Sequence, residues 1–224
     1  MIITIARRLR RRDEGLGLVE LVVSSLVGLI ILVTAGALLI SATRASNTQA
    51  LSDINARGAT TAMNAMSRYL HAATTYPTSA GTLPAFTSTG MGATDITFYA
   101  YVNLVSTAAQ PVKVRYYIDS TTKNLMEQLY SSTCSVTTGF CTFSPTATTI
   151  NLGGPVASPT SDTPPAPLFV YLNAGGAQTT VASAVQSVQI NLEYGSATPG
   201  APGNTHLTNT VALLNIGQFG GDSS

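Results

Sequence analysis

The chain has 224 residues, and only 9 % of them are charged, far below the roughly 25 % of an ordinary soluble domain. The formal charge of +1 divides unevenly, because residues 1–15 hold five arginines against two acidic residues and carry +3. The remaining residues hold 6 basic and 8 acidic side chains, a net −2. This distribution argues against a typical cytosolic enzyme and against a broad basic surface for nucleic acid. A hydrophobic fraction of 45 % also argues against a disordered chain.

A long apolar segment follows the basic residues. Residues 16–40 contain sixteen Leu, Val and Ile residues and one charge, Glu20. A helix of this length would be about 37 Å long and would cross a hydrocarbon core of about 30 Å. The apolar side chains outweigh the roughly 3 kcal/mol that one acidic residue costs at the helix centre. Since five arginines precede the segment and only Arg44 directly follows it, the N-terminus should be cytoplasmic and the later residues outside.

Ordinary export signals account for this segment less well. A cleaved signal peptide has an apolar core of about 7 to 15 residues, and this core is longer. The pair Arg7-Arg8 fits a twin-arginine signal, although such pairs are inevitable in a run of five arginines. An uncleaved signal anchor would be the simplest alternative without Glu20. Ionisable residues within a membrane span are costly, however, and normally have a partner.

The residues around Glu20 resemble a known processing signal. The basic leader is followed by Gly15-Leu16-Gly17-Leu18-Val19-Glu20-Leu21, which resembles the class III signal of type IV prepilins and type II secretion pseudopilins. The resemblance implies that a prepilin peptidase removes residues 1–15 by cutting between Gly15 and Leu16, and that the new amine is methylated. It further implies other pilins or pseudopilins, an inner-membrane assembly platform and, before assembly, membrane lipid as partners.

Two departures from the family pattern bear on the kind of subunit. Leu16 and Gly17 stand where the family most often has an aromatic residue and a small hydroxyl residue. Many major pilins carry a proline within the span, whereas the first proline here is Pro77. The missing proline favours a minor pilin.

A role for Glu20 in assembly also follows from its charge. Cleavage would leave a cationic amine on Leu16, which the Glu20 carboxylate of a neighbouring subunit could neutralise in a low-dielectric bundle. Such a pair would fix the axial register of adjacent helices and offset the cost of burying both charges. The alternative is an incidental glutamate that reaches water at the membrane surface.

The helical pattern continues beyond the apolar segment. We expect one helix from about residue 16 to about residue 73, ended by the Thr74–Pro77 segment, with residues 41–76 forming its extracytoplasmic half. Gly58 allows a bend, and Met63 and Met66 should fill the core. The apolar stripe that should pack against the rest of the protein consists of Leu51, Ile54, Gly58, Ala62, Met66, Leu70 and Ala73.

Residues 77–224 predict a β-rich head. Apolar and polar residues alternate with period two over residues 95–105 and 112–119, which is typical of antiparallel strands with one buried face. We expect an α+β fold in which one antiparallel sheet of about four to seven strands packs against the second half of the long helix. Shorter strands are expected at 125–130, 167–173, 185–194 and 208–216, and Pro- and Gly-rich connections at 77–94, 154–167 and 195–204.

The two cysteines, Cys134 and Cys141, lie in a Ser-, Thr- and Gly-rich segment that is expected outside the membrane. An even number of cysteines in an oxidising compartment favours a disulfide, here one that closes a small loop. A metal site is the alternative, but four ligands would be needed and no histidine is close in sequence.

No motif in the head predicts catalysis, a cofactor or a metal, and we expect no enzyme. The two histidines, His71 and His206, lack a context typical of such chemistry, and there is no phosphate-binding loop or nucleophile elbow. A glycosidase would need two juxtaposed carboxylates. The acidic residues of the head are scattered: Asp95, Asp119, Glu127, Asp162, Glu193 and Asp222. Lys113, Arg115 and Lys123 could meet on one hairpin and touch DNA, but a solvated strand face is the simpler interpretation.

The sequence therefore predicts a minor pilin, a single-pass inner-membrane protein that enters a type IV pilus after leader cleavage. A mid-chain disulfide and long loops favour a minor over a major subunit. Two alternatives stay open: a type II secretion pseudopilin, which shares these features, and an uncleaved, signal-anchored extracytoplasmic enzyme or adhesin.

Overall fold

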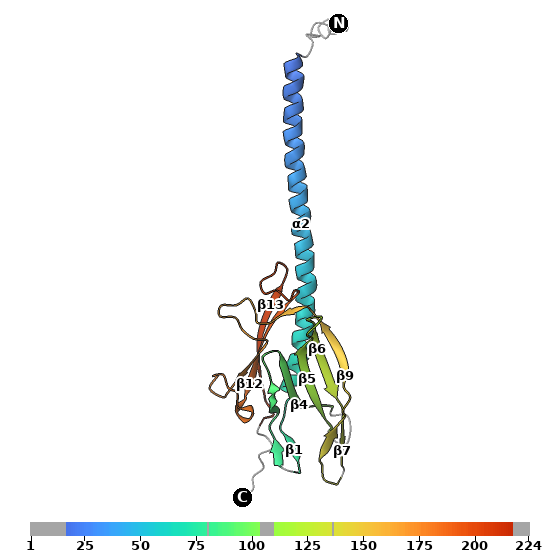
Figure 1. Cartoon of the computed structure of the whole chain (residues 1–224), viewed down its shortest axis with the longest axis vertical. Coiled ribbons are helices and arrows are strands. Elements are labelled where there is room, and N and C mark those ends of the chain that lie inside the picture. Colours follow the sequence, from blue (N-terminus) through green and yellow to red (C-terminus); the bar gives the residue numbers. More distant parts are fainter. Residues whose placement is uncertain (1–16, 80, 104–109, 136, 217–224) are drawn as a thin grey trace, which may run out of the picture. The chain divides into compact units, whose positions relative to one another are not determined.

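The computed structural model describes residues 17–79, 81–103, 110–135 and 137–216; the predicted leader, with Gly15, and Leu16 lie outside the described residues. The chain divides into two compact units, one ending at Thr48 and one beginning at Gln49. Helix α2 (Leu18–His71) contributes to both units, and all the strands belong to the second (Figure 1). The predicted α+β fold, with a long helix and antiparallel sheets, is confirmed.

The larger sheet of the head has five antiparallel strands. They are β3 (Phe86–Met91), β4 (Asp95–Asn103), β5 (Gln110–Ile118), β6 (Leu125–Tyr130) and β9 (Thr148–Gly153), in the order β3-β4-β5-β6-β9. The predicted alternation is observed, because Ile96, Phe98, Val114 and Tyr116 are buried on one face. The residues between them in sequence point to the opposite, solvent-facing side.

The second sheet has four strands arranged around β12 (Ser187–Tyr194). Strand β13 (Thr205–Ala212) pairs along the whole of one edge of β12. Strands β11 (Phe169–Leu172) and β10 (Val156–Ala157) share the other edge, each pairing with a different end of β12. The strands predicted at 167–173, 185–194 and 208–216 are thus present with somewhat different ends.

Two short hairpins complete the strands of the described residues. Strand β1 (Tyr76–Thr78) pairs with β2 (Gly81–Leu83), and β7 (Ser132–Cys134) pairs with β8 (Cys141–Phe143). A short 3-10 turn, η1, spans Ala182–Ala184. The expectation of one sheet with about four to seven strands was wrong, since the described strands form four sheets. Strand β3 also lies within the connection expected at 77–94, and β10 within the loop expected at 154–167.

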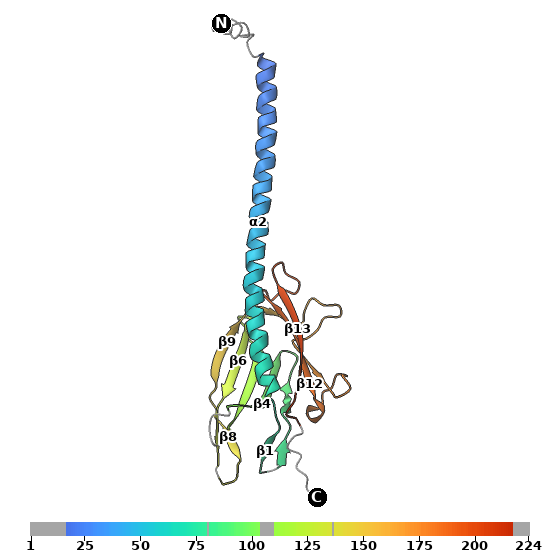
Figure 2. The same cartoon turned by 180° about the vertical axis from the view of Figure 1, so that it is seen from behind.

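The second half of α2 packs on the inner faces of the sheets. Its buried residues are Ala59, Ala62, Met63, Met66, Tyr69 and Leu70. Figure 2 shows the head from behind, and in this view the helix lies in front of strands β4 and β6. Figure 1 therefore shows the outer face of the five-stranded sheet. The predicted stripe packs only in part, because Leu51 and Ile54 are 57 % and 66 % exposed. The strands provide no cover for this earlier turn of the helix.

The hydroxyl of Tyr116 joins the helix to the five-stranded sheet. It donates to Glu127 Oε2 at 2.7 Å and lies 3.1 Å from the carbonyl oxygen of Ala65 in α2. Burial, together with the adjacent Glu127 carboxylate, raises the pKa of Tyr116 above its ordinary value. The ring therefore stays neutral, and its hydroxyl satisfies polar groups that would be costly to bury alone.

Gly58 permits close packing of Tyr194 against the helix. A Cβ at residue 58 would lie 2.7 Å from the Tyr194 hydroxyl oxygen and 2.8 Å from two ring carbons. The Tyr194 hydroxyl also lies against Gly153, which has φ of 92° and no room for a side chain. Gly58 thus leaves room for this packing, in agreement with its place on the predicted apolar stripe.

The substitution Gly58→Leu should lower the free energy of unfolding of the head by about 1–3 kcal/mol, because the Tyr194 ring has to leave its packed position. Thermal unfolding of the full-length protein in detergent, followed by circular dichroism, measures this change. The matched control is Gly36→Leu, since no atom lies within 4 Å of a Cβ at that position. Equal melting temperatures for the two variants would contradict the packing argument.

Candidate functional site

The first unit presents an apolar surface around the whole circumference of helix α2. All the described side chains from Leu18 to Ile40 except Gly36 are exposed, including large ones such as Leu18 at 82 % and Leu32 at 74 %. A helix that is apolar on every side is typical of a membrane span or the interior of a bundle. Among the described residues, α2 is the one helix whose length and composition would allow it to cross a membrane.

Two hydroxyl groups of this segment are satisfied within the helix. Ser25 donates to the carbonyl oxygen of Val22 at 2.8 Å, and Thr34 donates to that of Ile31 at 2.9 Å. Since each unsatisfied polar group costs several kcal/mol in hydrocarbon, this pattern suits an apolar surrounding as well as an aqueous one. Sequence reasoning missed this feature, although serine and threonine in an apolar helix were the signal for it.

Glu20 lies in the first turn of α2, next to the end at which helix dipoles favour a negative charge. Its backbone amide donates to the carbonyl oxygen of Gly17 at 2.8 Å, so the helix begins directly before it. The Glu20 side chain is exposed, and within the described part of the chain its carboxylate takes part in no hydrogen bond or ion pair. The processing residues that the sequence predicts, Gly15 and Leu16, are outside the described residues.

The predicted disulfide is confirmed, and it joins the two strands of the β7–β8 hairpin through Cys134 and Cys141. The hairpin is attached to the head through Tyr76, whose hydroxyl accepts a hydrogen bond from the amide of Cys141 at 2.7 Å. The Tyr76 ring packs against Tyr99 and Phe143, with centroids 5.2 and 5.3 Å away. Both thiols are used in the disulfide, and the described residues contain no cluster of three metal-binding side chains.

A buried carboxylate holds two of the long loops together. Glu193 in β12 is only 1 % exposed, and it accepts hydrogen bonds from the amides of Ser161 and Gly200 and from Asn204 Nδ2. Burial acts to raise the pKa of Glu193, but these hydrogen bonds favour the ionised form, and the pKa is lowered. The carboxylate therefore organises the loops predicted at 154–167 and 195–204.

A second carboxylate of these loops, Asp162, lies beside a histidine of β13. Asp162 Oδ2 lies 3.3 Å from His206 Nε2 and accepts a hydrogen bond from the Thr160 hydroxyl at 2.8 Å. The fold thus brings Asp162 and Glu193 into the same loop region. Each carboxylate, however, is held by donors of the chain itself, so the pair is explained by loop structure and provides no indication of glycosidase chemistry. The sequence contained no local signal for this arrangement, because the partners are far apart along the chain.

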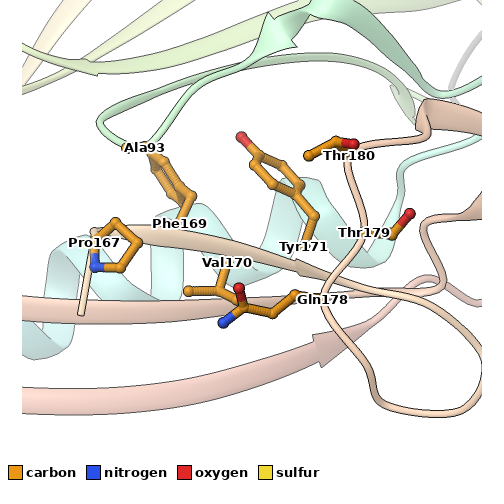
Figure 3. A pocket seen from close by; sticks show the side chains of 8 residues that line it. All are labelled: Ala93, Pro167, Phe169, Val170, Tyr171, Gln178, Thr179 and Thr180. Carbon is orange, nitrogen blue, oxygen red and sulfur yellow. The ribbon is translucent and has the colours of Figure 1, made fainter. Parts of the chain in front are cut away.

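A pocket of about 330 Å³ lies beside β11 (Figure 3). The side chains of Phe169 and Tyr171 point to one side of the strand, and Val170 points to the other. The Tyr171 hydroxyl donates to the carbonyl oxygen of Gly92 at 2.9 Å, and burial raises the pKa of Tyr171. The remaining lining residues are Ala93, Pro167, Gln178, Thr179 and Thr180. The lining holds no carboxylate, histidine or cysteine, and its tyrosine hydroxyl is already bonded to the chain.

The three basic residues considered for DNA do not form one patch. Lys113 and Arg115 lie on the outer face of β5, whereas Lys123 lies in the β5–β6 turn with φ of 59°. Arg115 donates from Nε to both Asp95 carboxylate oxygens, and Lys113 Nζ lies 4.1 Å from the centroid of the Tyr130 ring. Arg115 is thus paired within the sheet, and Lys113 lies over an aromatic ring.

No protein-family model matches the chain, and no curated protein or solved structure matches it either.

Replacing Glu193 by Gln should lower the free energy of unfolding by about 2 kcal/mol at pH 7, because an amide cannot accept all three hydrogen bonds. A carboxylate with a lowered folded-state pKa stabilises the protein above its unfolded-state pKa of about 4.3. That contribution is lost as the pH falls through the folded-state pKa. The difference between the wild type and Glu193→Gln should therefore shrink below about pH 4.

Thermal unfolding of full-length protein at several pH values measures this difference. The control is Asp53→Asn, which removes an exposed charge from the same unit and should change the melting temperature little. A difference between wild type and Glu193→Gln that does not depend on pH would contradict the assigned role of the carboxylate.

Proposed function

We propose that the protein is a structural subunit of a type IV pilus, most similar to a minor pilin, that is incorporated after its leader is cleaved. The observation that carries the proposal is one combination at the N-terminus. A basic leader ends in Gly15, and a helix follows that is apolar on all sides and bears a single carboxylate, Glu20, in its first turn.

The same apolar surface suits two successive surroundings. Before assembly, the segment from Leu18 to Ile40 would lie in the cytoplasmic membrane, with the leader in the cytoplasm and the head outside. After assembly, the apolar side chains would pack among the equivalent helices of neighbouring subunits. The internally bonded hydroxyls of Ser25 and Thr34 support both surroundings, since neither hydroxyl needs water.

Glu20 supplies the directional contact in this proposal. Cleavage after Gly15 would leave an amine on Leu16, and methylation would keep its positive charge. A carboxylate and an amine in a bundle of helices attract each other far more strongly than in water. Each would remain costly to bury alone, so the pair favours the assembled state and one axial register.

Two other functions share part of this support. A type II secretion pseudopilin would have the same signal, helix and Glu20, and it would serve protein secretion in place of a pilus. An uncleaved extracytoplasmic enzyme or adhesin would keep all five leader arginines and would not require Glu20. The position of Glu20, five residues after Gly15, favours the two processed forms over the anchored one.

Co-expression of the full-length chain with a prepilin peptidase should remove 15 residues, the length of the predicted leader. Intact-mass analysis of the membrane fraction measures both the cleavage and the added methyl group. The Gly15→Ala variant should keep its leader. An unchanged N-terminus in the wild type would exclude a processed pilin and favour the signal-anchored alternative.

Replacing Glu20 by Gln should leave cleavage intact, because the peptidase acts five residues away, but incorporation into filaments should fall by about tenfold or more. Quantitative immunoblotting of sheared filaments against the membrane fraction measures incorporation. The substitution Ser25→Ala, in the same segment and without a charge, provides the matched control. If Glu20→Gln and Ser25→Ala were incorporated equally well, charge pairing would have no part in assembly.

A further inference from the structure

The outer face of the five-stranded sheet carries an ordered polar row that the proposed function does not use. Arg115 Nε lies 3.1 and 3.0 Å from the two carboxylate oxygens of Asp95 on the neighbouring strand β4. On the other side, Arg115 and Gln128 are paired in register, and Gln128 is paired with Thr149 in β9. The row therefore crosses four strands, a width of about 14 Å at a strand spacing of about 4.8 Å.

Two tyrosines flank this row. Tyr117 follows Arg115 on the same face of β5, and the Arg115 guanidinium carbon lies 4.6 Å from the centroid of its ring. Tyr130 is on the neighbouring strand β6, with Lys113 Nζ 4.1 Å from its ring centroid and its hydroxyl 3.2 Å from Gln128 Oε1. Among the described residues, neither ring packs against another ring. Each ring is thus fixed by a cation and by the sheet.

The face formed by Asp95, Arg115, Gln128, Tyr117 and Tyr130, called here the tyrosine face, remains accessible. Its polar side chains are neither buried nor free, and the side chains of Asp95 and Arg115 are each 37 % exposed. The face also lies on the opposite side of the sheet from helix α2 (Figures 1 and 2). Helix α2 therefore does not cover this face.

The charges of the tyrosine face argue against nucleic acid as its ligand. Asp95 neutralises Arg115, which leaves Lys113 as the one basic group of this face with no acidic partner among the described residues. A single-stranded nucleic acid needs cations along its backbone as well as rings for its bases. One available cation would neutralise about one phosphate. The chemistry of the face fits an uncharged ligand better.

We propose that the tyrosine face binds an extended, uncharged polysaccharide of flat pyranose rings. Such rings present C–H groups on their faces, which pack against aromatic side chains, and hydroxyl groups at their edges. A hydroxyl both donates and accepts hydrogen bonds, and the row offers both partners, because Asp95 accepts, Arg115 donates and Gln128 does either. An open sheet face suits a flat polymer better than a compact ligand, which normally occupies a concave pocket.

The side chains of the tyrosine face are already held in place, which favours binding. Side chains that are already held in one arrangement lose little conformational entropy when a ligand arrives. Here Arg115 is held by Asp95, and Tyr130 is held by Lys113 and Gln128. Tyr117 and Tyr130 are about 14 Å apart by strand spacing and register, a distance that several linked sugar rings would span.

Affinity electrophoresis of the full-length protein in non-ionic detergent tests the proposal. The native gels contain hydroxyethyl cellulose, galactomannan or a soluble chitin oligomer, and parallel lanes contain an oligothymidylate. At least one neutral polysaccharide should retard the protein, equally between about 50 and 300 mM NaCl, because no counterions are released. The double variant Tyr117→Ala/Tyr130→Ala should bind at least about tenfold more weakly, a loss typical of stacking on aromatic rings.

The double variant Tyr117→Phe/Tyr130→Phe is the matched control, since it keeps both rings and should keep most of the affinity. Gln128→Ala keeps both rings but removes a polar group of the row and its hydrogen bond to Tyr130, and it should also weaken binding. Circular dichroism establishes that each variant is folded. Retardation by none of the polysaccharides, or equal retardation of the Ala and wild-type forms, would overturn the proposal. Binding of the oligothymidylate alone, falling steeply with salt, would replace polysaccharide by nucleic acid.

Discussion

The surroundings of helix α2 differ between its first and second parts, and the rest of the structure depends on this difference. Up to Ile40 its side chains are apolar and exposed on every side. Between Ala59 and Leu70, one face is buried against the sheets and the other is polar. No other described residue covers the first segment, whereas the second provides the surface on which the head is built.

The close contact between helix and sheets requires small residues and satisfied polar groups. Ala59 and Ala62 let the strands approach, and Gly58 leaves room for the Tyr194 ring. At the same interface, Tyr116 provides a hydroxyl for Glu127 and lies near a helix carbonyl. The polar groups are part of the packing, since an unsatisfied carboxylate at this place would cost several kcal/mol.

The elements with a clear local pattern could be predicted from the sequence. Residues 95–103 show strict alternation and form β4, and the period of three to four residues identified the buried part of α2. Strands β3 and β9 were missed because they are rich in threonine and glycine, which resemble loop composition. The division into four sheets depends on non-local pairing, as where β10 and β11 share one edge of β12. No local pattern specifies such pairing, nor the Glu193 contacts.

The two buried carboxylates of the head differ from Glu20 in one respect. Glu127 accepts from Tyr116, and Glu193 accepts from three donors on two loops. Both are therefore stabilised within their own head. Glu20 lies in an apolar segment, where a carboxylate needs a partner most, and the described part of the chain offers none. A donor supplied by a second molecule would resolve this difference, and the amine that cleavage would create on a neighbouring subunit has the required charge.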